Sequence, residues 1–139
     1  MLRGACRYVE LPGHVLVHAG IAPGVPLAEQ TAYDLMWIRE PFLSHGGPFG
    51  KTVVHGHSVT TSGRCEVFAN RIGIDTGAYE SGRLSAVHIE PSGSISFLGT
   101  EPGSAPGEIE AMVFDSPRTS ASASTAAAAG AAVRSRVRP

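Results

Sequence analysis

Two short apolar segments, each carrying histidine at or near its end, constrain the fold of this chain more than any other feature. They are residues 14–18 (HVLVH) and 51–58 (KTVVHGHS). Both are rich in valine, and Gly20 and Pro23 follow the first, so the pattern predicts two short buried strands. Residues 27–38 lie between them and carry apolar side chains at mixed spacing, which predicts a helix, whole or broken into two pieces. Together these elements predict an α/β fold.

The remainder of the chain divides into a folded part and a tail. Pro-Ser-Gly at residues 91–93 predicts a hairpin turn between strands at 84–90 and 94–99. After Gly99 the composition shifts to Ala, Ser, Pro and Gly. Such a segment offers little apolar surface to offset the roughly 1–2 kcal/mol that ordering each residue costs. The sequence therefore predicts one domain at residues 1–99 and a disordered tail at 100–139.

Composition and charge exclude several classes of protein. A formal net charge of -1 over 139 residues gives no electrostatic footprint for nucleic acid or an anionic membrane surface. There is no apolar run of the roughly 20 residues needed to span a bilayer, and the first residues are not expected to act as a secretion signal. Cys6 and Cys65 lack the spacing of a metal site, and reduced thiols in a cytoplasmic protein are expected, with a disulfide left open.

The two histidines at the predicted strand ends are candidate metal ligands. His18 and His57 would both project from the carboxyl ends of strands, where α/β sheets collect their ligands, and neutral imidazole commonly binds Zn, Fe and related ions. Gly20 and Gly56 would let the backbone approach a bound group. Arg39, between the histidines, has a guanidinium suited to phosphate. A catalytic metal site normally needs three protein ligands, so these residues alone leave metal binding and ordinary packing equally open.

Residues 9–99 also resemble a known family. Four blocks carry the likeness, in matching order and spacing, within HVLVHAGIAPGVPLAEQTAYDLMWIREPFL, GKTVVHGHS and NRIGIDTGAYESGRLSAVHIE. They are similar to the C-terminal half of bacterial calcineurin-like metallophosphoesterases of the serine/threonine protein phosphatase type. The resemblance implies two mixed β-sheets packed face to face with flanking helices outside. This chain would supply one of those sheets and little of the other.

The resemblance implies roles for individual residues. His18 and His57 would bind one ion of a divalent metal pair (Mn, Fe or Zn), and Arg39 would clamp the substrate phosphate. Asp75 and Tyr79 would border the site as second-shell residues, with a structural, turn-capping role favoured for Asp75.

Two neighbours of these residues are expected to support the site or the core. His55 is expected in the second shell or in packing, because strand periodicity would place it on the same face as His57. Trp37 is expected to pack. No role is assigned to the other histidines, His14, His45 and His88. Ser58-Val59 stand where the family usually has Thr-Pro, so a different loop shape is expected after His57.

The family's other conserved blocks are absent from this sequence. These are Gly-Asp-x-His-Gly, Gly-Asp-x-x-Asp-Arg-Gly and Gly-Asn-His-Asp/Glu, which hold the remaining metal ligands, the bridging aspartate and the acid histidine. No catalytic residue is therefore assigned in this chain, and a truncated product, a split enzyme or a C-terminal piece is expected, with an N-terminal half as a candidate partner.

The resemblance nevertheless implies a reaction. The complete enzyme would hydrolyse a phosphorylated protein or a small phosphoester with two metals, weakly or not at all in this chain alone. The alternatives are a symmetrical dinucleoside tetraphosphate hydrolase and a non-catalytic remnant, which binds a partner or nothing.

Overall fold

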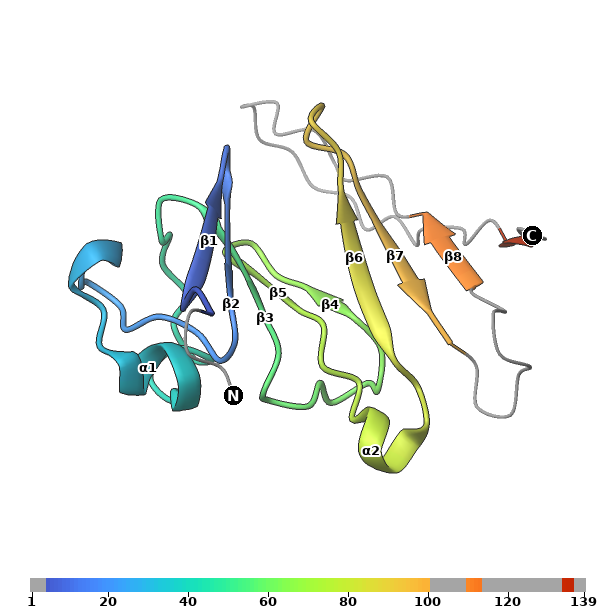
Figure 1. The fold of residues 1–139 in the computed structure, drawn as a ribbon, viewed down its shortest axis with the longest axis horizontal. Coiled ribbons are helices and arrows are strands. Elements are labelled where there is room, and N and C mark those ends of the chain that lie inside the picture. The colour runs from blue at the N-terminus through green and yellow to red at the C-terminus, as the bar shows by residue number, and fades with distance from the viewer. Residues whose placement is uncertain (1–4, 101–109, 114–133, 137–139) are drawn as a thin grey trace.

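A five-stranded mixed sheet forms the centre of the molecule (Figure 1). The computed structural model describes residues 5–100, 110–113 and 134–136. The strands of this first sheet lie in the order β1-β2-β3-β5-β4. Strands β2, β3 and β5 are parallel to one another, and β1 and β4 pair antiparallel at the two edges. Their bounds are β1 Tyr8–Leu11, β2 His14–Val17, β3 Thr52–His55, β4 Glu66–Val67 and β5 Arg71–Gly73.

The connection from β2 to β3 contains two short helical pieces, which confirms the broken helix expected at residues 27–38. A 3-10 turn, η1, spans Leu27–Glu29, and helix α1 spans Ala32–Trp37. Thr31 caps α1 because its Oγ1 accepts a hydrogen bond of 3.0 Å from the Asp34 backbone N–H. The parallel pairing of β2 and β3 requires such a crossover.

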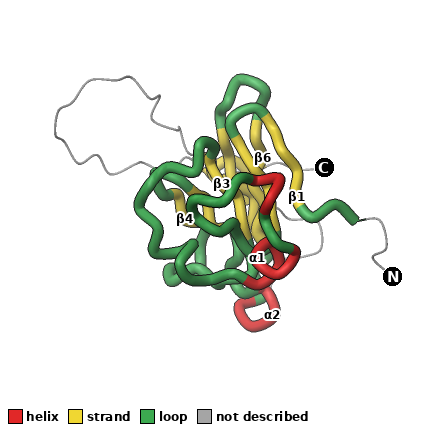
Figure 2. The backbone as a smooth tube through the Cα atoms, turned by 90° about the vertical axis from the view of Figure 1, so that its left-hand side faces the viewer, coloured by secondary structure: helices red, strands yellow, loops and turns green. Residues whose placement is uncertain are grey.

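One face of the first sheet is covered by α1 and the neighbouring loops, which lie in front of the strands in Figure 2. Alternation along β3 sends Val53 to this face and Val54 to the other. The first core cluster consists of Ala19, Ile21, Leu35, Ile38, Phe42 and Val53. Phe42 is fully buried at its centre, and a Cβ added to Gly20 would lie 2.4 Å from the Phe42 ring. Gly20 is therefore needed for packing against Phe42.

The opposite face of the first sheet packs against a second, antiparallel sheet in the order β6-β7-β8-β9. Its strands are β6 Ser85–Ile89, β7 Ile95–Gly99, β8 Glu110–Val113 and β9 Arg134–Arg136, and the short helix α2, Ala78–Ser81, lies between β5 and β6. Buried Val54, Ile72, Ile95 and Phe97 form the core between the sheets. The β6–β7 hairpin confirms the predicted turn, with Gly93 at φ 87°.

The second sheet is larger than the sequence predicts, because two segments of the expected tail extend it. Residues 110–113 pair with β7, and residues 134–136 pair with β8. The sequence predicts no strand in either segment, so β8 and β9 are additions to the predicted sheet. The physical reason is that the outer edge of β7 offers unpaired backbone N–H and C=O groups, which a further strand can satisfy whatever its composition. The rest of the predicted tail lies outside the described residues.

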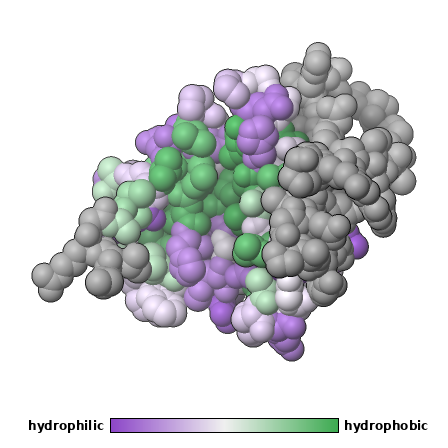
Figure 3. Space-filling model, turned by 45° about the vertical axis from the view of Figure 1, so that its right-hand side comes forward, coloured by the Kyte–Doolittle hydropathy of each residue, from purple (hydrophilic) through white to green (hydrophobic). Residues whose placement is uncertain are grey.

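Apolar side chains gather on one face between polar ones (Figure 3). Exposed large hydrophobic residues in the described part include Val9 and Leu84. Cys6 and Cys65 are both free thiols. In the part of the chain that the structure describes, no helix has the length and apolar character to cross a membrane.

Candidate functional site

His18 and His57 lie side by side at the carboxyl ends of two neighbouring parallel strands. The register pairs Val17 with His55, so His18 is the first residue after β2 and His57 the second after β3. The Gly56 N–H donates a hydrogen bond of 2.9 Å to the His18 carbonyl, which ties the two strand ends together. The centroids of the two imidazole rings are 5.1 Å apart. The structure thus brings together the two metal ligands that the sequence predicts.

The backbone at His57 is what turns its side chain out of the strand direction. Its φ is 63°, and within the described residues His57 is the one non-glycine residue with a positive φ. A non-glycine residue in the left-handed region costs about 1–3 kcal/mol, and glycine would adopt the same conformation without that cost. The chain therefore retains an imidazole at a position where the backbone alone favours glycine, which points to a use for the side chain.

The pair fits a shared divalent ion. With about 2.0–2.1 Å from the metal to one nitrogen of each ring, the two ring centroids would lie roughly 4.5–5.5 Å apart. The observed 5.1 Å is within that range. His18 is exposed and His57 is half-buried, so an ion can reach both from solvent. The described residues contain no group of three or more His, Cys, Asp or Glu side chains placed to hold an ion, so this part of the chain offers half of a coordination sphere.

Trp37 lies against this pair, where the sequence predicts only a packing role. Its indole is 61% exposed, and its ring centroid is 5.6 Å from that of His57, with the two planes at 87°. Trp37 ends α1, and the Leu35 carbonyl accepts a hydrogen bond of 2.9 Å from the Ala19 N–H, which holds the helix against the end of β2. The sequence gives no signal for this position of Trp37, because an aromatic residue within a helical pattern ordinarily indicates a core position.

Arg39 follows α1 and is exposed. Its carbonyl accepts a hydrogen bond of 2.8 Å from the Leu43 N–H, which fixes the backbone. Within residues 5–100 the guanidinium takes part in no ion pair. Arg39 lies two residues beyond Trp37, whose ring contacts His57. Its guanidinium is therefore near the histidine pair in the chain and is available to bind an anion.

Hydrogen bonds to Asp75 hold the loop that contains His57. Its Oδ1 accepts a hydrogen bond of 2.9 Å from the Gly77 N–H, the turn-capping bond expected from the sequence. Its carbonyl accepts bonds from the Thr60 N–H at 2.9 Å and Oγ1 at 3.2 Å. A Cβ added at Gly56 would lie 3.8 Å from the Asp75 Cβ. Asp75 therefore links β5 to the loop after β3 at the edge where the histidines lie.

Tyr79 is the residue of the expected site border that belongs to the second helix. It lies on α2, is 86% exposed, and has no ring contact with His18 or His57 in the described structure.

His55 belongs to the core and does not share a face with His57. Strand β3 ends at His55 and the left-handed backbone at His57 breaks the two-residue alternation, so the periodicity argument fails. The His55 ring is 3% exposed and lies edge-on to Phe42, with centroids 4.9 Å apart. Its Nδ1 is 3.2 Å from the Gly56 carbonyl oxygen, and its Nε2 is buried with no hydrogen-bond partner among the residues that the structure describes. Burial lowers the pKa of His55 below its usual range, since desolvation disfavours the charged imidazolium.

We expect this burial to make the fold sensitive to acid. The folded pKa of His55 is below the unfolded value near 6.5, so as the pH falls below about 6.5 the unfolded chain binds a proton that the folded chain resists. Stability should then fall by at most about 1.4 kcal/mol per pH unit from this group, and should be fully retained above that range. Urea unfolding of the wild type and His55→Leu at pH 5 and pH 7.5 measures the effect. The variant should lose less stability on acidification, whereas a control His88→Leu, exposed on β6, should behave like the wild type.

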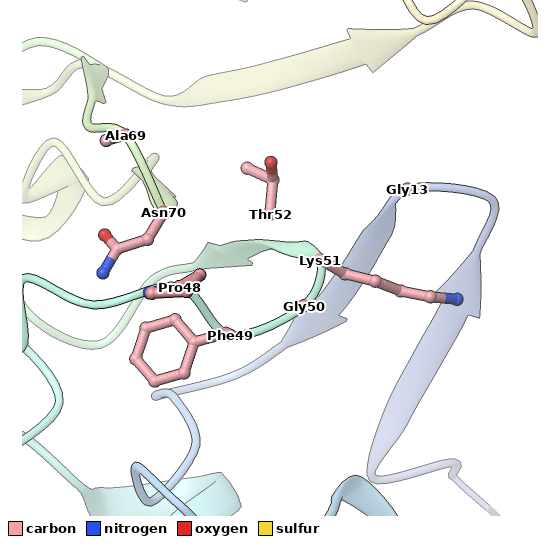
Figure 4. A pocket seen from close by; sticks show the side chains of 8 residues that line it. All are labelled: Gly13, Pro48, Phe49, Gly50, Lys51, Thr52, Ala69 and Asn70. Carbon is pink, nitrogen blue, oxygen red and sulfur yellow. The ribbon is translucent and has the colours of Figure 1, made fainter.

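A shallow pocket lies where β3 begins, at the other end of this strand from His57 (Figure 4). It is lined by Gly13, Pro48, Phe49, Gly50, Lys51, Thr52, Ala69 and Asn70. The Lys51 ammonium is already committed, at 2.8 Å from the Glu10 carboxylate and 3.0 Å from the Leu11 carbonyl. None of the predicted site residues lines this pocket, so the histidine pair remains the candidate site.

Comparisons with known proteins found no match to this chain among protein families, curated proteins or solved structures.

Proposed function

We propose that this chain supplies one half of the active site of a metal-dependent phosphoester hydrolase, with the calcineurin-like fold and the protein phosphatase type that its motifs resemble. The main support for the proposal is the His18–His57 pair at the ends of the parallel strands β2 and β3, where the centroids of the two imidazole rings are 5.1 Å apart. Two sheets with helical segments outside the first are compatible with that fold. The free thiols of Cys6 and Cys65 suit the reducing cytoplasm.

Each residue of the site has a distinct part. His18 and His57 bind one divalent ion (Mn, Fe or Zn) through their imidazole rings. Arg39 binds the substrate phosphate through its guanidinium. A bound metal pair would supply an activated water and charge neutralisation at the phosphate. Asp75 holds the loop of His57 in register through Gly77 and Thr60.

Two protein ligands leave the site dependent on a second polypeptide segment. A catalytic metal centre ordinarily has at least three protein ligands, and the described residues contribute two here. We propose that the remaining ligands, including acidic ones, come from a segment with the family's aspartate and asparagine blocks, on the same or another chain.

Metal binding can be measured with the chain itself, because Trp37 is its only tryptophan and its indole contacts His57. We expect zinc added to the apoprotein at pH 7.5 to change the Trp37 emission in a saturable manner. His57→Gly is the sharpest variant, since glycine accepts the backbone φ of 63° and the fold should be kept. We expect this variant and His18→Ala to weaken zinc binding by at least about tenfold.

The matched control is His88→Ala, which removes an exposed histidine from the second sheet and should leave the titration unchanged. Equal zinc affinity in the wild type, His18→Ala and His57→Gly would contradict the proposal, as would an effect of His88→Ala as large as theirs. Circular dichroism of each variant confirms that the comparison is made on folded protein.

A further inference from the structure

An exposed aromatic surface adjoins the candidate metal ligands. Trp37 stands nearly perpendicular to the His57 imidazole, at 87°, yet 61% of its side chain faces solvent. On the same helix Tyr33 is 73% exposed, and residues four apart lie on one helix face. Met36, between them, is 39% exposed. Three large side chains of a six-residue helix therefore face outward beside the site, whereas Leu35 alone is buried in α1.

The packing of the fold does not account for this surface. The core on this side of the sheet is completed by Leu35, Ile38 and Phe42, without Trp37 or Tyr33. Trp37 has one ring contact in the described structure, and it is with His57. An indole with an open ring surface beside a ligand-binding residue is suited to stacking on a planar group.

We infer that Trp37, continued by Tyr33, is a stacking platform for a planar ring carried by the phosphoester that binds at His18, His57 and Arg39. This inference rests on the proposed function and specifies its substrate class. Aromatic rings attract one another at centroid distances of roughly 4.5–7 Å, and the indole lies 5.6 Å from His57, so a ring attached to a phosphate at this site can reach it. An alkyl phosphoester has no such surface and gains only the contacts of its phosphate.

Two sources share this chemistry, an aryl phosphate and a nucleoside monophosphate, because each presents a planar π system next to a phosphate. Stacking of a ring on an aromatic side chain typically changes affinity by about tenfold or more. The platform therefore acts on specificity: it favours ring-bearing phosphoesters without changing how the phosphate itself is held.

The test uses the full chain saturated with zinc and non-hydrolysable probes. Ligand-observed NMR titrations compare phenylphosphonate with methylphosphonate, and a third titration uses adenosine 5′-monophosphate. We expect phenylphosphonate to bind about tenfold more tightly than methylphosphonate. In Trp37→Leu this ratio should fall below about twofold while the affinity for methylphosphonate stays the same. The control Phe68→Leu, an aromatic residue 40% exposed next to β4, should keep the wild-type ratio.

The outcomes separate the two claims. Equal binding of both phosphonates by the wild type, or a ratio that Trp37→Leu leaves unchanged, overturns the platform while the metal site stands. Absence of zinc-dependent binding of either phosphonate overturns the proposed function together with the platform. Tighter binding of the nucleotide than of phenylphosphonate supports the platform with a nucleoside phosphate as its source, and the reverse order supports it with an aryl phosphate.

Discussion

The purified 139-residue chain is expected to hydrolyse p-nitrophenyl phosphate barely above background when manganese is added. The described residues provide two candidate ligands and no cluster of three, so this part of the chain holds no further residues assigned to the second metal or to the general acid of the proposed reaction. Loss of a general acid alone typically lowers a rate by about 10²–10⁴-fold. Initial rates with and without manganese, at matched protein concentration, measure this.

Activity should appear when the complementary half is added. A separately expressed polypeptide with the Gly-Asp-x-His-Gly, Gly-Asp-x-x-Asp-Arg-Gly and Gly-Asn-His-Asp/Glu blocks should restore manganese-dependent turnover. With that half present, His57→Gly or Arg39→Gln should then lower the rate by about 10²–10³-fold, because the first removes a ligand of the metal and the second removes a cation at the phosphate. Strong turnover by the chain alone, abolished by His18→Ala, would show that this fold builds a competent site unaided.

The second large effect is expected at Phe42, on which both the core and the site edge depend. Its side chain is fully buried and fills the space that Gly20 leaves open. Its ring lies edge-on to His55 and tilted to Phe49, with ring centroids 4.9 Å and 5.4 Å apart. Phe42→Ala should lower the free energy of unfolding by about 3–5 kcal/mol, measured by urea denaturation.

A fold of this size has little stability in reserve, since about 5–15 kcal/mol is typical. Phe42→Leu therefore serves as a milder variant, with an expected loss of roughly 1–2 kcal/mol. Tyr79→Ala, which truncates an 86% exposed ring, should change stability by less than about 0.5 kcal/mol. A loss of under about 1 kcal/mol for Phe42→Ala would contradict the central place of Phe42 in this core.

The sequence predicted the elements that depend on local patterns. The apolar runs gave β2 and β3, and the Pro-Ser-Gly turn gave the β6–β7 hairpin, because valine-rich runs and turn residues act over a few positions. Two strands of the second sheet, β8 and β9, were not predicted. Their formation depends on the free edge of β7, which is a property of the folded sheet and not of residues 110–113 or 134–136 themselves.

In the candidate site, too, some positions follow from local sequence patterns and others depend on the tertiary fold. His18 and His57 could be predicted as a pair because parallel strands present their carboxyl ends at one edge. The position of Trp37 beside His57 could not, since it depends on how the connection after β2 folds back. His55 and His57 were expected on the same face of one strand. That prediction is wrong because the backbone of His57 has φ 63°, and strand periodicity holds only for extended residues.

The most direct test of the central claim is X-ray absorption spectroscopy of the chain loaded with one equivalent of zinc. If His18 and His57 bind the ion together, the spectrum should show two imidazole nitrogens at about 2.0–2.1 Å, with the remaining ligands being light oxygen atoms. His57→Gly should reduce the imidazole count to one. A wild-type spectrum with fewer than two imidazoles, or one that is the same in His57→Gly, would contradict the account.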